Sequence, residues 1–125
     1  MIAIAVDICK NFIDLFVKSK QISEEKKLKI SKILEDISLI LVDTAQKFER
    51  NEYPHGNCVV MENLSSKLCQ KLDGMVEQED LKKLEKSLIE ASLLEKLYTE
   101  RNEETIKALH IASGEFKSLS IIIKI

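Results

Sequence analysis

Proline, glycine and tryptophan are scarce in this 125-residue chain, which has one proline, three glycines and no tryptophan. Turns that depend on these residues are therefore few, and the composition favours long regular elements joined by short connections. An excess of one charge is also lacking, because 19 basic and 21 acidic side chains leave a formal net charge of −2. Nucleic-acid-binding proteins usually carry a strong basic excess, so we do not expect nucleic acid as a partner.

Cysteine is limited to Cys9, Cys58 and Cys69, an odd number at wide spacing that predicts no disulfide framework. Cys58 and Cys69 fall on one predicted helix, where eleven residues separate them by about 16 Å, beyond disulfide reach. The amino-terminal residues lack the basic region of a signal peptide. No apolar run approaches the roughly 20 residues of a membrane span. We therefore expect a protein with free thiols in the cytoplasm.

Apolar residues recur every three to four positions along the whole chain, which is the pattern of amphipathic helices. The pattern predicts helices at about residues 2–19, 23–50, 57–72, 77–100 and from 102 onward. Short connections make successive helices antiparallel neighbours. We therefore predict a single all-α domain spanning residues 1–125, folded as an antiparallel up-and-down bundle of four to five helices.

Particular residues predict where the helices begin, end and approach one another. Ser23, Asn57 and Asn102 are suited to cap helix N-termini, and Gly56 and Gly74 can adopt the positive φ of a turn. The segment 112–114, Ala-Ser-Gly, predicts a close approach of a neighbouring helix. The β-branched tail, residues 121–125, either frays or forms a short edge strand.

The best chemical pair lies at the proline corner. Cys58 falls in the first turn of a predicted helix, three residues after His55, and a helix dipole favours the thiolate there. We favour the simpler interpretation that Cys58 begins the buried seam of this helix. Glu52 and His55 have the Glu-x-x-His spacing of di-iron bundles, but Pro54 interrupts any helix between them. We therefore expect no enzyme activity, no cofactor and no metal site.

Both ends of the chain are more apolar than one small bundle needs. In an up-and-down path of five helices the two termini lie at opposite ends, so they would not cover each other. Packing against the second and fourth helices would cover them, or a second chain would. The candidate interaction surface combines residues of both ends with residues of the proline corner: Ile2, Phe12, Phe16, Tyr53, Pro54, His55, Ile121, Ile122 and Ile125.

These features predict a non-enzymatic helical bundle that acts through protein–protein interaction. It would be an adaptor, an inhibitor or a small regulatory subunit, with another protein or a second copy of itself as partner. The alternative is a membrane-active effector whose apolar N-terminal helix and lysine cluster, Lys18 to Lys32, engage anionic lipid. Glu24 and Glu25 interrupt this cluster, so a solvated lysine face is the simpler interpretation.

Overall fold

The computed structural model describes residues 2–17, 22–92 and 102–125. This part of the chain contains five α-helices and no strand, which confirms the prediction of an all-α fold. The helices are α1 (Ile2–Phe12), α2 (Glu24–Glu49), α3 (Asn57–Leu72), α4 (Gln78–Ser92) and α5 (Glu103–Ile122). A short π-helix, η1 (Ile13–Val17), continues α1. Residues 18–19 and 93–100, which complete the predicted first and fourth helices, lie outside the described ranges.

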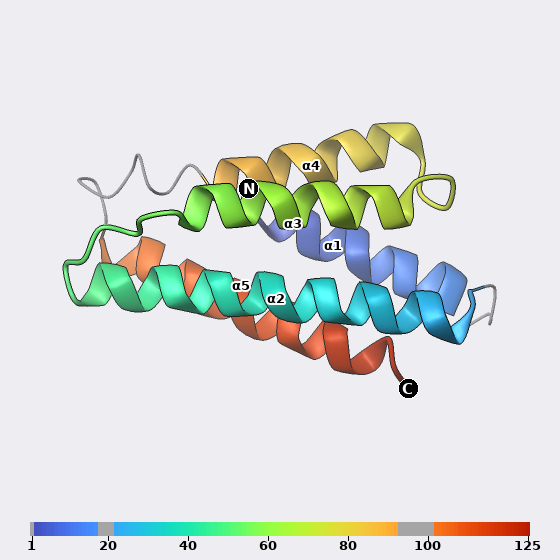
Figure 1. Ribbon diagram of the computed structural model, residues 1–125, viewed down its shortest axis with the longest axis horizontal. Helices are drawn as coiled ribbons and strands as arrows, with labels where there is room; N and C mark the ends of the chain where they lie inside the picture. The colour runs from blue at the N-terminus through green and yellow to red at the C-terminus, as the bar shows by residue number, and fades with distance from the viewer. Residues whose placement is uncertain (1, 18–21, 93–101) are drawn as a thin grey trace.

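The five helices alternate in direction and form a closed ring (Figure 1). Around this ring α1 lies beside α4, α4 beside α3, α3 beside α2, α2 beside α5, and α5 again beside α1. The antiparallel up-and-down bundle is therefore confirmed. The expected cover of the first helix was partly wrong, because its main neighbours are α4 and α5 rather than α4 and α2. Only two of the four consecutive helix pairs, α2–α3 and α3–α4, make extensive contact.

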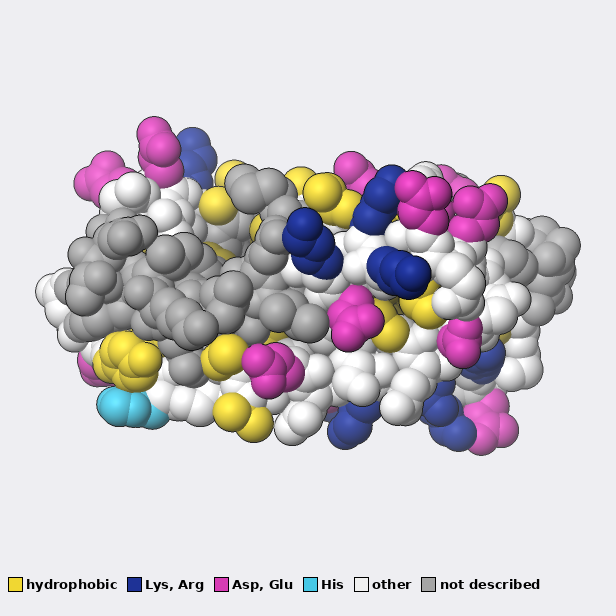
Figure 2. All heavy atoms as spheres, turned by 90° about the horizontal axis from the view of Figure 1, so that it is seen from above, with side chains coloured by type: hydrophobic (Ala, Val, Ile, Leu, Met, Phe, Trp, Pro, Cys, Tyr) yellow, Lys and Arg dark blue, Asp and Glu magenta, His cyan; other side chains and the backbone are white. Residues whose placement is uncertain are grey.

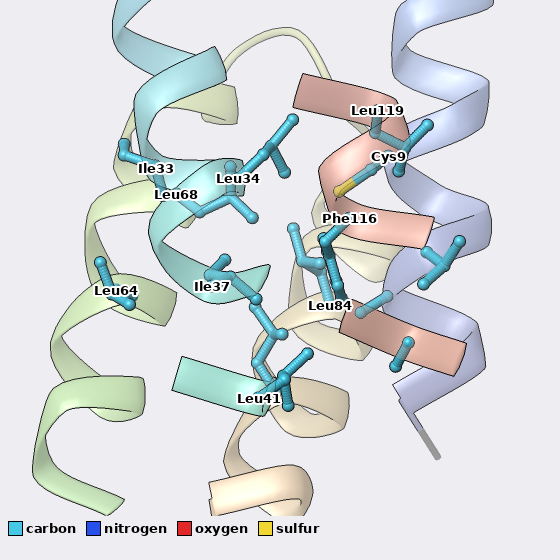
Figure 3. Packing of buried hydrophobic residues seen from close by; sticks show 14 of the residues in the cluster. Cys9, Ile33, Leu34, Ile37, Leu41, Leu64, Leu68, Leu84, Phe116 and Leu119 are labelled. Carbon is cyan, nitrogen blue, oxygen red and sulfur yellow. The ribbon is translucent and has the colours of Figure 1, made fainter. Parts of the chain in front are cut away.

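The predicted apolar stripes meet in one core between the helices (Figure 3). Each helix contributes side chains that are almost fully buried, including Cys9 of α1, Leu34 and Ile37 of α2, Leu68 of α3, Leu84 of α4 and Phe116 of α5. Burial of one such aliphatic or aromatic side chain contributes roughly 1.5–3 kcal/mol. Leu39 of α2 lies off the apolar stripe of this helix and is 54% exposed.

The predicted caps are correct at two of three helix N-termini. Ser23 Oγ accepts from the backbone N–H of Lys26 at 3.2 Å, and Asn102 Oδ1 accepts from that of Thr105 at 2.8 Å. Asn57 was predicted wrongly, because the N-cap of α3 is Gly56, at φ 79°, and it has no side-chain cap hydrogen bond. The reason is a tertiary contact: the start of α3 lies against the end of α2, and the side chain of Asn57 forms hydrogen bonds with residues of α2 instead of capping α3.

A buried polar cluster around Asn57 holds this corner. Its amide donates to Thr44 Oγ1 at 2.6 Å and to Asp43 Oδ2 at 3.1 Å, and its carbonyl oxygen accepts from Lys47 Nζ at 3.2 Å. A buried amide needs such partners, since an unpaired one would raise the free energy of the folded state. These hydrogen bonds therefore hold the start of α3 against the end of α2.

At the other end of α3, Gly74 stops the helix as predicted. It adopts φ 85°, and the backbone N–H of Met75 donates to the carbonyl of Leu72 at 3.0 Å. This closes a turn whose third residue needs positive φ, which glycine adopts without strain. The edge strand considered for the C-terminal tail was wrong, because α5 runs to Ile122 and Ile123 is fully buried in the core.

Pairs of buried serines join α2 to α5. Ser38 Oγ donates to the carbonyl of Ser113 at 2.8 Å, and Ser113 Oγ donates to the carbonyl of Ser38 at 2.8 Å. Further along, Ser31 Oγ donates to the carbonyl of Ser120 at 2.6 Å. The predicted close approach at residues 112–114 thus occurs at Ser113. It does not involve Gly114, which is exposed and where an added Cβ would have no neighbour within 4 Å.

Candidate interaction surface

The structure separates the predicted interaction residues. Ile121, Ile122 and Ile125 are exposed at the C-terminal end of α5. Tyr53 and His55 are exposed at the α2–α3 corner, with their ring centroids 4.7 Å apart. Figure 1 shows these two groups at opposite ends of the bundle, so they do not form one surface.

The remaining predicted residues do not extend either group. Phe12 is only 3% exposed and belongs to the core, and Pro54 is buried at the corner, so both were placed wrongly on a surface. The physical reason for Phe12 is that α4 and α5 flank α1 on either side. Ile2 is half-buried against the core. The side chain of Phe16 lies outside the described part of the structure.

A longer apolar strip runs along the side of α5 that faces away from the core. We call it the α5 outer face and define it by six exposed residues: Ile111, Gly114, Ser118, Ile121, Ile122 and Ile125. They recur every three to four positions, as residues on one side of a helix do. Ile111, Ile121 and Ile122 are 51%, 48% and 41% exposed. None of the six residues carries a charged side chain.

Sequence reasoning found only the isoleucines at the end of this face. Ile111, Gly114 and Ser118 were missed, although the sequence held a signal for them. Leu109, Ala112 and Phe116 recur every three to four positions in the sequence, and in the structure they form part of the buried stripe of α5. Residues two positions from that stripe point away from it, which places Ile111 and Gly114 on the outer side.

Ionisable residues border the α5 outer face on both sides. On the side toward α2, Lys117 Nζ lies 3.8 Å from Glu35 Oε1, and His110 Nε2 lies 2.6 Å from Glu49 Oε1. On the side toward α1 the bordering residue of α5 is Glu115, which is half-buried. The charges that α5 itself contributes therefore differ in sign, with Lys117 on the α2 border and Glu115 on the α1 border, and the α2 border also holds carboxylates of α2.

A groove between α1 and α5 adjoins the Glu115 border. It has a volume of about 300 Å³, and its lining consists of Lys10, Ile13, Asp14, Glu115, Ser118, Leu119 and Ile122. Its apolar lining comes from Ile13, Leu119 and Ile122, and its charged lining comes from the carboxylates Asp14 and Glu115 and from Lys10. The groove therefore suits an apolar side chain, with two carboxylates and one lysine beside it.

Other parts of the surface have a different character. Figure 2 shows that the side of the bundle seen from above, over α3 and α4, carries hydrophobic side chains separated by basic and acidic ones. Three lysines at the start of α2 are paired with carboxylates of the same helix: Lys27 with Glu24 at 3.1 Å, Lys29 with Glu25 at 3.0 Å, and Lys32 with Asp36 at 3.1 Å. These pairs support the interpretation of a solvated lysine face. Lys18 and Lys20 of the predicted cluster lie outside the described residues.

The surroundings of two of the three cysteines disfavour the reactive thiolate form. Burial raises the pKa of the Cys9 thiol to about 12, with a smaller contribution from Cys69. Burial, followed by the charge of Glu85, raises the pKa of Cys69 to about 11. Cys58 Sγ donates to Glu62 Oε1 at 3.6 Å. Among the described residues no group of three or more His, Cys, Asp or Glu side chains is arranged to hold a metal ion.

Comparison of the chain with known protein families, with curated proteins and with solved structures gives no match. Within the described residues, no helix combines the length and the apolar character that crossing a membrane requires. The surface of the bundle itself therefore carries the information on function.

Proposed function

We propose that the protein acts through protein–protein interaction, as a non-enzymatic adaptor, inhibitor or small regulatory subunit, and that the α5 outer face is its contact surface. One observation carries this proposal. Six residues on one side of α5 and of the turn that follows it are exposed and uncharged. Four of them are isoleucines, of which Ile111, Ile121 and Ile122 have about half of their surface in water and Ile125 is almost fully exposed. Covering apolar surface contributes roughly 25 cal/mol per Å² to an association, so this face favours a partner.

The composition of the surroundings also supports the proposal. Protein interfaces commonly combine an apolar centre with a polar rim. Here the isoleucines form the centre, and Glu115 on one side and Lys117 on the other form the rim. The centre would supply most of the binding free energy, and the rim would orient the partner. We further propose a cytoplasmic location, which the free thiols of Cys9, Cys58 and Cys69 support.

Affinity capture from the native cell, followed by mass spectrometry, tests this proposal. The tagged protein is compared with two variants in which an exposed apolar residue becomes charged. Ile111→Lys changes the α5 outer face, and Val59→Lys changes an equally exposed position on α3. Circular dichroism of both variants checks that the bundle still folds.

We expect partners that are retained by the unchanged protein and by Val59→Lys but lost from Ile111→Lys. If every captured protein is retained by Ile111→Lys, the α5 outer face is not the contact surface. If Val59→Lys alone loses its partners, the contact surface lies on α3 instead, and the proposal for α5 is wrong.

A further inference from the structure

We propose that the partner of the α5 outer face is the same face of a second copy of the chain, with the two α5 helices running parallel. This inference rests on the proposed function of that face and names its partner. Three features of the face carry the inference: an exposed glycine within the helix, the opposite charges of Glu115 and Lys117 on its two borders, and the groove beside α1.

The first feature is the small centre of the face. Gly114 and Ser118 lie one turn apart, with Ile111 on one side of them along the helix and Ile121 and Ile122 on the other. A glycine inside a helix is unfavourable compared with alanine unless another backbone must approach closely. Within the described residues nothing makes such an approach, since an added Cβ at Gly114 would meet no atom within 4 Å. A second helix crossing at Gly114 and Ser118 would use the available space.

The second feature is charge, which selects the occupant and its direction. When two identical helices pack in parallel about a twofold axis, the α1 side of one faces the α2 side of the other. Glu115 of each copy then lies close to Lys117 of the other copy. In an antiparallel pair the like borders meet, which places Glu115 near Glu115 and Lys117 near Lys117. Like charges facing each other across an interface are unfavourable, so the charges that α5 itself carries favour the parallel arrangement, in which Lys117 and its neighbour Glu35 of one copy meet Glu115 of the other.

The third feature is the groove between α1 and α5. Ile121 projects from the α2 side of the outer face, and Ile122 lines the groove on the α1 side at nearly the same height along α5. A parallel second copy therefore brings its Ile121 to this groove, and its Lys117 one turn below approaches Glu115 and the charged lining of Asp14 and Lys10. The twofold axis repeats the contact, so two isoleucines are covered in the same way, as in an isologous interface.

The size of the face sets the expected strength of the dimer. One helix face and one groove per copy belong to the lower end of specific protein interfaces. We therefore expect a dimer that dissociates on dilution and that weakens as salt screens the Glu115–Lys117 pairs.

Sedimentation equilibrium of the purified chain over a broad dilution series tests the inference. The unchanged protein is expected to shift from dimer to monomer on dilution. Gly114→Leu blocks the crossing point while leaving the monomer intact, because position 114 is open. The matched control is Ser66→Leu, at an exposed position on α3. We expect Gly114→Leu to raise the dissociation constant about tenfold or more and Ser66→Leu to leave it nearly unchanged. A chain that is monomeric at every concentration, or a dimer indifferent to Gly114→Leu, would overturn the inference.

Charge reversal tests the direction of the two helices. Glu115→Lys alone places two positive charges at each contact of the parallel pair and weakens it, and Lys117→Glu alone weakens it with two negative charges. The double variant, with both changes in one chain, restores opposite charges and dimerisation. In an antiparallel pair position 115 faces position 115 and position 117 faces position 117. Like charges therefore meet in the unchanged protein, in the double variant and in each single variant, so a single change weakens the dimer little. Single variants that dimerise as well as the unchanged protein would therefore contradict the parallel arrangement.

These outcomes are distinguishable from failure of the proposed function. If the chain stays monomeric but loses a captured protein on Ile111→Lys, the face binds a different partner, and only the inference of self-association is wrong. If a dimer forms and ignores every change on α5, it uses another surface, and the inference is overturned whatever the capture experiment shows.

Discussion

Replacing Gly114 by alanine is expected to stabilise the monomer. Gly114 lies well inside α5, is exposed, and has no atom within 4 Å of the position that a new Cβ would take. The substitution therefore meets no steric resistance and gains the helix propensity of alanine, which exceeds that of glycine by about 1 kcal/mol. Part of this gain arises in the unfolded chain, where alanine has less backbone freedom to lose. For a chain of this length the melting temperature rises by about 3–5 °C.

The control is the same substitution at Gly74. There too an added Cβ meets nothing within 4 Å, but φ is +85°. An L-residue is strained in that region by about 1–2 kcal/mol, so Gly74→Ala is expected to lower stability. The two glycines have the same open surroundings and opposite expected signs, and only the backbone conformation differs between them.

Thermal and urea unfolding, followed by circular dichroism in solutions dilute enough that we expect a monomer, measures both variants. The reasoning is refuted if Gly114→Ala lowers the free energy of unfolding, since a contact within the monomer would then need the glycine. The same variant also separates stability from association. We expect Gly114→Ala to raise the dissociation constant of the dimer and also to raise the free energy of unfolding of the monomer. If Gly114 had only a structural role in the monomer, the substitution would not weaken the dimer.

Three further predictions concern the interior. Leu88→Ala is expected to lower the free energy of unfolding by about 2–5 kcal/mol, because Leu88 is fully buried; an unchanged urea midpoint would contradict this burial. Asn57→Ala removes partners of Thr44 and Asp43 and is expected to cost about 1–3 kcal/mol, measured in the same way, with exposed Asn63→Ala as the control of near-zero effect. The third concerns alkaline pH: the unfolded thiol of Cys9 ionises near pH 9.0, whereas the folded one stays protonated to about pH 12. The folded state therefore loses stability as pH rises through this window, and urea titrations of Cys9→Ala are expected to show a smaller loss.

The sequence predicted the local structure well, because helix formation depends mainly on neighbours three and four residues apart. The buried stripe of α2, from Ile30 to Phe48, was read from its period alone. Ser23 and Asn102 cap their helices as predicted, since each needs only the backbone N–H three residues ahead. Gly74 ends α3 for the equally local reason that only glycine enters positive φ without strain.

Residues whose role depends on a distant partner were predicted less well. Asn57 has the right residue type for a cap, but the end of α2 offers it Thr44 and Asp43 instead. Phe12 belongs to an apolar helix at one end of the chain, but α4 and α5 cover it. Gly114 belongs to a small-residue segment, but Ser113 makes the contact with α2 and leaves Gly114 in solvent.

The sequence by itself therefore determined the helical fold, the number of helices as four to five, most of their ends and which side of each is apolar, because all of these follow from short-range periodicity and backbone conformation. Only the tertiary structure decided the order of the helices around the ring, and with it the side of α5 that remains open. That order depends on contacts between residues far apart in the chain, such as Ser38 with Ser113, for which the period of a single helix contains no information. The candidate interaction surface is a consequence of that order, and for this reason the sequence located only its C-terminal isoleucines.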